Sequence, residues 1–422
     1  MLLSCYVASV RPGGNSRLAT REMWTTVGIV TCDWPTDPSA ADNVISTWLE
    51  RSGILPLTLR LEHKSSCNPA STATALIEAI LSAFGSQASR WQDVYLSLPE
   101  TLPVLFPQLG NLPLLQALHF DGRSQNMANL TFSGSPRLAR LSGSYPLIAL
   151  KNPRIPWSQI SHLCISTRIT IFDASKAIRI CSRLEEFQVK LVDHHTIPDN
   201  HLTRTPVVEN HHLQTLVITS KYGCPLFDSL KLPSMREFGL GVDGLKPAFY
   251  LGLKPLLKLL TRSGCELDTL RLKNCILGGA WLLELFEHQS LETVQMLSIE
   301  NSRNHRMFID DVLIRLTYTN PPPTTVSRVL LPNLTRLTLG MCVARIASPS
   351  TLGRMVHSRR CSWQEHGTKQ LEFFSLITSK IDFLHDALLR EAISDGLVAN
   401  NIIVNEEGGQ YGDHGADIWD AF

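Results

Sequence analysis

The sequence has little net charge, no long apolar run and no closely spaced cysteine pair. The formal net charge of the 422-residue chain is +1, so no strong field is available to attract nucleic acid or an anionic membrane. Apolar stretches are interrupted well before about 18 residues, which predicts no transmembrane helix. The short apolar start, Met1–Val10, has no preceding basic region and is followed by Arg11 and Pro12, unlike a secretory signal peptide.

The 10 cysteines are scattered, and no two stand at a CxxC spacing. Cys164, Cys275 and Cys342 lie inside apolar segments that have the character of strands. Since no secretory signal is recognised, this pattern predicts reduced, buried thiols and a cytoplasmic or nuclear location.

Motifs of common catalytic and cofactor sites are missing as well. The chain has no G-x-S-x-G elbow, no GxxxxGK[ST] loop and no GxGxxG after a strand. His194-His195 and His211-His212 are neighbouring pairs without cysteine or carboxylate partners at zinc-ligand spacing. We therefore predict no catalytic residue, no metal site and no cofactor, and an enzyme of unrecognised type is the least favoured hypothesis.

Two charged clusters have plain interpretations. Asp310-Asp311 is expected on a helix, where neighbouring side chains point about 100° apart, so we interpret it as helical surface. Arg359-Arg360, with Trp363 nearby, is one short basic and aromatic cluster. Nucleic-acid binding needs a longer basic stripe, so we interpret this cluster as a solvated helix end and predict no nucleic-acid partner.

The N-terminal part of the chain contains a poorly ordered segment and then alternating helices and strands. Residues 1–36 show little periodicity, which predicts poor order. An amphipathic helix is expected over Ser39–Arg51 and a strand with alternating leucines over Leu55–Leu61. A helix over Leu76–Phe84 and a strand over Trp91–Leu98 repeat this order.

From there a short pattern recurs, Leu-x-x-Leu-x-Leu with other apolar residues allowed. Its copies begin at Leu115, Ile160, Leu184, Leu213, Met235, Leu267, Leu291, Leu334 and Leu371, with a weaker copy over Pro136–Leu141. They are about 22 to 43 residues apart. The gaps hold helix-like stretches such as Phe249–Arg262, Ala280–Glu287 and Phe308–Leu316. Short gaps leave room for a strand and an extended return, and long gaps for a helix.

The best copy, Leu267–Leu277, matches the whole leucine-rich-repeat consensus L-x-x-L-x-L-x-x-N/C-x-L. We therefore predict an α/β leucine-rich-repeat solenoid over residues 37–380. It would be an irregular horseshoe with parallel strands on the concave face and helices or loops on the convex face. Residues 381–422 are predicted to form a capping helix, over Asp382–Asp395, and an acidic disordered tail.

The concave face is the predicted partner-binding surface. In each strand the leucines point into the core and the residues between them point outward. The outward positions predicted to bind a partner are Gln188, Lys190, Thr215, Val217, Thr269, Arg271, Lys273, Arg336 and Thr338.

Three stretches carry a family resemblance. Trp48–Leu59, Arg90–Pro99 and the repeated Leu-x-x-Leu-x-Leu strands resemble the first helix and strand, the second strand and the repeat region of mushroom-type fungal F-box/leucine-rich-repeat proteins. Glu22–Ile29 resembles the link that follows the F-box in that family. Upstream of this link, Pro12 and the neighbouring glycines do not suit a three-helix module, so the F-box itself is expected to be missing or degenerate.

The resemblance implies a substrate receptor of an SCF-type ubiquitin ligase. Its partners would be protein targets, a Skp-type adaptor and a cullin, with no nucleic acid and no membrane. A free-standing leucine-rich-repeat scaffold without a ligase link is the alternative that the sequence leaves open.

Overall fold

The computed structural model describes residues 21–31, 38–63, 70–98, 111–121, 134–144, 155–192, 207–220, 224–242, 253–275, 279–300, 310–318, 329–340, 349–361, 363–364, 368–378 and 386–403. The predictions for His194-His195, Cys342 and the acidic tail lie outside these residues. The chain divides into two compact units. Unit 1 comprises residues 1–218 and 229–234, and unit 2 comprises residues 219–228 and 235–422.

The strands form a large parallel sheet in which they follow one another in chain order. It has 14 strands in the order β1-β2-β3-β4-β5-β6-β7-β9-β11-β12-β13-β14-β15-β16, and β8 pairs with β10 separately. This confirms the predicted α/β class and the parallel strands. The strands are β1 Thr26–Val30, β2 Leu57–Glu62, β3 Trp91–Ser97, β4 Ala117–Asp121, β5 Arg140–Gly143, β6 His162–Ile169, β7 Glu186–Leu191, β8 Val208–Glu209, β9 Thr215–Ser220, β10 Leu230–Lys231, β11 Glu237–Val242, β12 Thr269–Lys273, β13 Met296–Glu300, β14 Arg336–Gly340, β15 Phe373–Thr378 and β16 Val398–Ile403.

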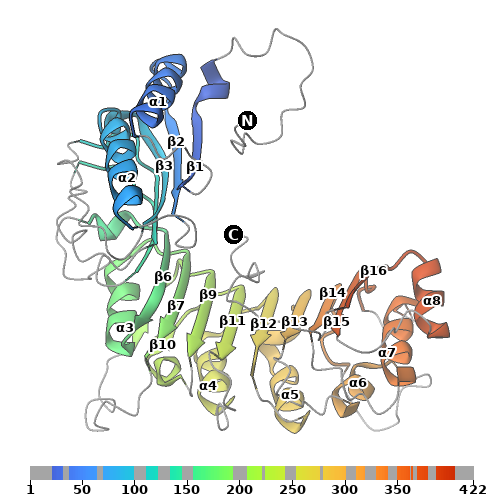
Figure 1. Cartoon of the computed structure of the whole chain (residues 1–422). Coiled ribbons are helices and arrows are strands. Elements are labelled where there is room, and N and C mark those ends of the chain that lie inside the picture. Colours follow the sequence, from blue (N-terminus) through green and yellow to red (C-terminus); the bar gives the residue numbers. More distant parts are fainter. Residues whose placement is uncertain are drawn as a thin grey trace. The chain divides into compact units, whose positions relative to one another are not determined.

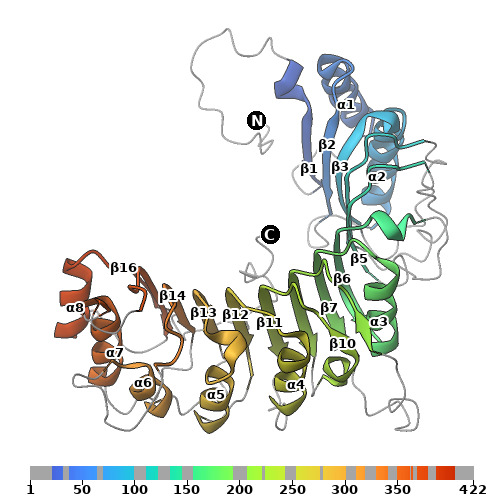
Figure 2. The same cartoon turned by 180° about the vertical axis from the view of Figure 1, so that it is seen from behind.

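Helices occupy the connections between strands. They are α1 Pro38–Ser52, α2 Ala70–Gly85, α3 Ile171–Ile180, α4 Leu253–Ser263, α5 Gly279–Phe286, α6 Asp310–Leu316, α7 Pro349–Cys361 and α8 Ala387–Ser394, with 3-10 turns at Arg21–Trp24, Ala88–Arg90, Trp157–Gln159, Pro225–Ser229 and Gln289–Leu291. In unit 1, α1 and α2 pack against each other on one face of the first strands (Figures 1 and 2). In unit 2, α4 to α8 lie along one face of β11–β16 in chain order (Figures 1 and 2).

The core lies between the strands and these helices, and it is built from aligned apolar rows. In unit 2 the inward row reads Phe238, Leu270, Leu297, Leu337 and Phe374 across neighbouring strands, and all of them are buried. The corresponding row of unit 1 is Val27, Leu59, Val94, Leu118, Leu141, Leu163 and Phe187. Each such side chain contributes about 1.5–3 kcal/mol by leaving water, so the rows hold neighbouring strands together.

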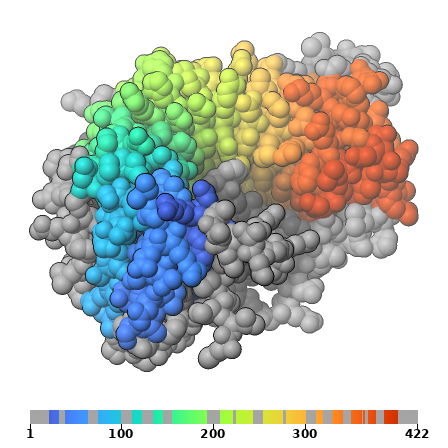
Figure 3. Space-filling view, turned by 90° about the horizontal axis from the view of Figure 1, so that it is seen from above, coloured from blue at the N-terminus to red at the C-terminus, as the bar shows by residue number. Residues whose placement is uncertain are grey.

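A further apolar residue precedes each strand of the large sheet from β4 to β15. These residues have no exposed surface, and they are Leu115, Leu138, Ile160, Leu184, Leu213, Met235, Leu267, Val294, Leu334 and Leu371. They occupy the first position of the Leu-x-x-Leu-x-Leu pattern, so nearly every predicted copy is placed as expected. In Figure 3 the elements of unit 2 run from yellow to red in the order of the sequence.

One copy of the pattern was assigned the wrong frame. The copy at β13 was predicted to place Leu291, Val294 and Met296 in the core. Leu291 and Val294 are buried, but the strand buries Leu297 and Ile299 and turns Met296 to the outer face. Because side chains alternate along a strand, both frames offer apolar residues at the core positions. In the weaker copy, Pro136–Leu141, Leu138 and Leu141 are both buried, and Gly143 takes the next inward position of β5.

The predicted boundaries of the array also need correction. Residues 1–36 were expected to be poorly ordered, but Arg21–Trp24 forms a 3-10 turn and β1 pairs in parallel with β2. β1 is therefore part of the sheet and not of a separate segment. At the other end, α8 confirms the predicted capping helix, starting later than Asp382, and β16 adds a strand after it.

The end of β12 shows how the consensus position after a strand works. Asn274 adopts a left-handed backbone conformation with φ of 55°, which turns the chain out of the strand. The buried Cys275 thiol then donates to the Leu240 carbonyl, with Sγ–O of 3.3 Å. Burial raises the pKa of this thiol to about 12, so Cys275 stays protonated and serves as a weak hydrogen-bond donor.

Candidate functional site

All the predicted partner-binding residues lie on strands, on the face opposite the buried rows. They are Gln188 and Lys190 on β7, Thr215 and Val217 on β9, Thr269, Arg271 and Lys273 on β12, and Arg336 and Thr338 on β14. Lys190 and Arg336 are exposed and the others are half-buried. We call this face, as formed within each unit, the outer strand face.

In unit 2 the outer strand face combines charged, aromatic and small residues in register. One row runs from Thr269 through Met296 and Arg336 to Phe373. The Arg336 guanidinium lies over the Phe373 ring, 6.0 Å from its centre. Beside this row, Arg271 pairs with Glu237 on the neighbouring strand at 3.0 Å, with only 11% of its side chain exposed.

The next row of unit 2 is lined by small side chains. Ser298, Thr338 and Ser375 stand in register on β13, β14 and β15, and Ser298 donates to the Glu300 carboxylate at 3.1 Å. Glu300 packs against Gly340, where an added Cβ would lie 3.0 Å from Glu300 Cγ. Ser298 and Ser375 are buried and Thr338 is half-buried, so this row offers little hydroxyl surface to a partner.

In unit 1 the outer strand face carries an aromatic stack. The rings of Tyr95 on β3 and His119 on β4 lie 4.3 Å apart and nearly parallel, with an interplanar angle of 5°. The guanidinium of Arg60 on β2 lies over the Tyr95 ring, 4.7 Å from its centre, and also pairs with Glu62 at 3.3 Å. Stacked rings of this kind form flat, rigid contact area at low entropic cost.

Ion pairs and polar contacts continue across the same face of unit 1. His162 on β6 and Glu186 on β7 are in register, with 3.9 Å between Nε2 and Oε2. The Cys164 thiol donates weakly to the Gln188 side-chain oxygen, with Sγ–O of 3.6 Å. The exposed Lys190 on β7 is in register with Arg168 on β6, so both of these strands carry a basic side chain near their carboxyl ends.

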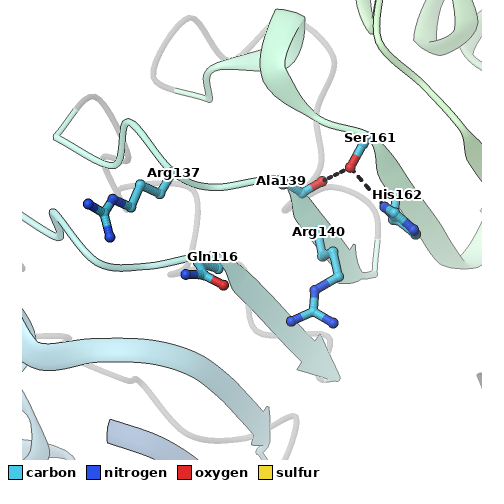
Figure 4. Close-up of a pocket in the computed structure, with 6 residues that line it drawn as sticks. All are labelled: Gln116, Arg137, Ala139, Arg140, Ser161 and His162. Carbon is cyan, nitrogen blue, oxygen red and sulfur yellow. Dashed lines mark hydrogen bonds between the residues drawn. The ribbon is translucent and has the colours of Figure 1, made fainter. Parts of the chain in front are cut away.

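A hollow of about 570 Å³ opens where β4, β5 and β6 begin. It is lined by Gln116, Arg137, Ala139, Arg140, Ser161 and His162 (Figure 4). Arg140 extends from β5 across the neighbouring Ala117 position to Asp93 on β3, with 2.9 Å between guanidinium and carboxylate. Ala117 leaves room for this crossing.

Ser161, His162 and Glu186 have the residue types of a hydrolase triad. Ser161 Oγ lies 2.8 Å from His162 Nδ1. The nearby amides of Ser161 and His162, however, both donate to the Ala139 carbonyl, at 2.9 Å and 3.1 Å, and therefore cannot stabilise an oxyanion. The histidine and glutamate side chains are 42% and 35% exposed, so the trio lacks the dry, preorganised surroundings of an acyl-transfer site.

Other chemistry has little support within the described part of the chain. No group of three or more His, Cys, Asp or Glu side chains is placed there to hold a metal ion, and no helix among the same residues has the length and apolarity to cross a membrane. Burial raises the pKa of Cys181 and of Cys224 to about 12, which makes both thiols poor nucleophiles.

The interpretation of Arg359-Arg360 as a solvated helix end is wrong. Arg359 has no exposed surface and its guanidinium donates to the carbonyls of Leu316, Leu330 and Leu331. Arg360, with 12% of its side chain exposed, pairs with Asp395 at 3.1 Å. Both arginines lie on α7 and hold elements of unit 2 together, so neither belongs to a recognition surface.

Sequence reasoning missed the polar residues of unit 1. Tyr95, His119, Arg140, His162 and Glu186 occupy outward positions of strands that were recognised, yet none was named as a candidate. The signal was present, because each stands directly before or between the inward apolar residues of its strand. Their mutual contacts depend on register between strands and could not be read from one strand alone.

No protein-family model matches the chain, and no curated protein matches it either.

Proposed function

We propose that the chain is a leucine-rich-repeat solenoid that recognises a partner protein through its outer strand face. The observation that carries the proposal is the alignment of polar, charged and aromatic side chains on the face that the helices leave open. Consecutive parallel strands repeat the same outward positions, so they present a broad surface whose residues can vary while the buried rows stay constant.

The composition of this face suits protein recognition. Arginine and aromatic side chains such as Arg60, Tyr95, Arg336 and Phe373 are the types that anchor protein interfaces. They are held in place by stacking and by ion pairs within the face. Such preorganisation lowers the entropic cost of binding.

We further propose that the recognised protein is the substrate of an SCF-type ubiquitin ligase, with this chain as the receptor. The support is the resemblance of Trp48–Leu59, Arg90–Pro99 and the repeated strands to fungal F-box/leucine-rich-repeat proteins. The competing proposal is a free-standing leucine-rich-repeat scaffold without a ligase link.

The test is affinity capture of partners by the tagged full chain from its own cells, read by mass spectrometry. Arg336→Glu reverses a charge on the outer strand face, whereas Lys258→Glu makes the same reversal at an exposed position of α4. Recognition through the face predicts a partner that the Arg336→Glu chain loses and the Lys258→Glu chain retains. Equal capture by both variants would refute the proposal.

The ligase link has its own readout in the same experiment. Recovery of a Skp-type adaptor and a cullin with the wild-type chain supports the receptor role. Recovery of a face-dependent partner without either of them favours the free-standing scaffold.

A further inference from the structure

The sheet of unit 2 ends at β16, which has one open edge. β16 pairs with β15 on one side, and no other described strand pairs with it (Figures 1 and 2). The Val398 amide donates to the Glu372 carbonyl at 3.0 Å. Because the backbone groups of successive residues in a parallel strand point to opposite sides, the N–H and C=O groups of Ala399 and Asn401 point to the open edge. A further strand could form hydrogen bonds with these groups.

The edge of β16 lacks the features that usually prevent strands from pairing with other chains. Such features are charged residues, proline and β-bulges. Val398–Ile403 contains no charged residue and no proline, and it pairs with β15 without a shift of register. Val398 is 57% exposed, and Asn400 is exposed as well. The edge is therefore regular and uncharged, as expected of a strand that pairs with another strand.

The helical layer of unit 2 ends differently from its sheet. α8 is the last described helix, and it exposes Arg390, Glu391 and Ser394 while it buries Leu389 and Ala392. A terminal repeat needs a polar outer surface to keep a repeat array soluble. α8 provides this surface on the helical side, whereas β16 provides no charge on the strand side. The contrast indicates that the strand edge, and not the helix, contacts another chain.

We propose that β16 pairs with β16 of a second copy of this chain, antiparallel and about a two-fold axis. Each copy then supplies the donors and acceptors that the other needs, and the contact closes after two copies. Because β16 is uncharged, self-pairing brings no like charges together. The added strand extends the sheet in its own plane and leaves the outer strand face open, so the inference is independent of the recognition role.

The test is sedimentation equilibrium of the purified full chain over a series of concentrations. Ala399→Pro removes an N–H group from the open edge and leaves the bonds to β15 in place, a position that tolerates proline. Val398→Lys places a charge on the edge strand without altering its backbone. Ile314→Lys is the matched control, because Ile314 lies on α6 and is 54% exposed, close to the 57% of Val398.

We expect a reversible dimer of the wild-type chain that dissociates on dilution, because a short edge forms few hydrogen bonds. Ala399→Pro is present in both copies and removes two of these bonds, so the dissociation constant should rise about tenfold to a hundredfold. Val398→Lys should weaken the dimer as well, and the weakening should diminish as salt is added. Ile314→Lys should leave the dissociation constant unchanged. Circular dichroism verifies that each variant is folded.

The edge of β1 provides a second control. The Thr58 amide donates to the Thr25 carbonyl at 2.8 Å, so the Thr26 N–H points away from β2 and Thr26→Pro removes it from the other edge of the sheet. The proposed dimer is unaffected by this change. Loss of association in both Thr26→Pro and Ala399→Pro would show head-to-tail pairing of β16 with β1, which builds open chains, and would overturn the inference.

Two other outcomes would also overturn it. One is a chain that stays monomeric at every concentration at which it is soluble. The other is a dimer whose dissociation constant is unchanged by Ala399→Pro and by Val398→Lys. Hydrogen exchange locates the contact independently, because the Ala399 and Asn401 amides should become more protected as the concentration rises. Capture of a partner that depends on Arg336 is a separate result and stands or falls without the dimer.

Discussion

Replacing Arg359 tests how unit 2 is held together behind its outer strand face. Its guanidinium donates to the carbonyl of Leu316 at the end of α6, at 2.7 Å, and to those of Leu331 and Leu330 before β14, at 3.0 Å and 2.5 Å. It also lies 4.7 Å from the centre of the Tyr318 ring. Carbonyls at a helix end have no partner in the helix itself, so this one side chain satisfies groups from two separate segments.

The cost of Arg359→Met follows from these contacts. Each buried carbonyl that loses its donor costs about 1–3 kcal/mol, which would give about 3–9 kcal/mol for the group. Part of this is offset, because burying a charged guanidinium is itself unfavourable, and burial lowers the pKa of Arg359 for the same reason. We therefore expect a net loss of about 3–5 kcal/mol, or a Tm lower by about 6–20 °C.

The assay is thermal and urea unfolding, followed by circular dichroism, together with hydrogen exchange in β14. The matched control is Arg354→Met on the same helix, because Arg354 is exposed and its contacts lie within α7. This control should change stability by about 0.5 kcal/mol or less. Equal destabilisation by the two variants, or unchanged exchange in β14, would refute the role assigned to Arg359.

Two further predictions concern the close packing of α7 on α8 and the buried thiols. Asp386 caps α8, and an added Cβ at Gly353 would stand 2.2 Å from Asp386 Oδ1. Gly353→Ala should therefore destabilise the wild-type chain by more than it destabilises the Asp386→Ala chain. Additive losses of stability in unfolding measurements on the single and double variants would contradict this expectation. Burial raises the pKa of Cys224 and of Cys275 to about 12, so iodoacetamide at pH 8 should modify the exposed Cys361 before either of these two thiols. Early labelling of either buried thiol, mapped by mass spectrometry, would show that the packing is different.

The Leu-x-x-Leu-x-Leu pattern was sufficient to predict the parallel strands because its apolar period and its spacing both reflect burial on one face. It failed at β13, where Leu291, Val294, Met296, Leu297 and Ile299 support two frames. Only pairing of Leu270 with Leu297 and of Leu337 with Leu297 selects the frame that completes the buried row. A slip of one residue exchanges the faces of a strand, so Met296 became surface.

Helix α3 and the burial of Arg359 were not predicted. The short gap between Ile160 and Leu184 was expected to hold an extended return, yet it contains α3, capped by Thr170, whose Oγ1 accepts from the Asp173 amide at 3.1 Å. This capping pair is visible in the sequence but is common by chance. The burial of Arg359 could not be foreseen, because its carbonyl partners come from residues 28, 29 and 43 positions away in the chain.

The sequence alone determined the α/β class, the parallel strands and which side chains of most strands face outward, because these follow from local apolar spacing. Tertiary structure decided which outward residues meet one another. The Tyr95–His119 stack, the Arg140 crossing over Ala117 and the hollow beside it each join side chains from different strands. Such contacts depend on register between strands, which is set when the buried rows align and not by any one segment of the chain.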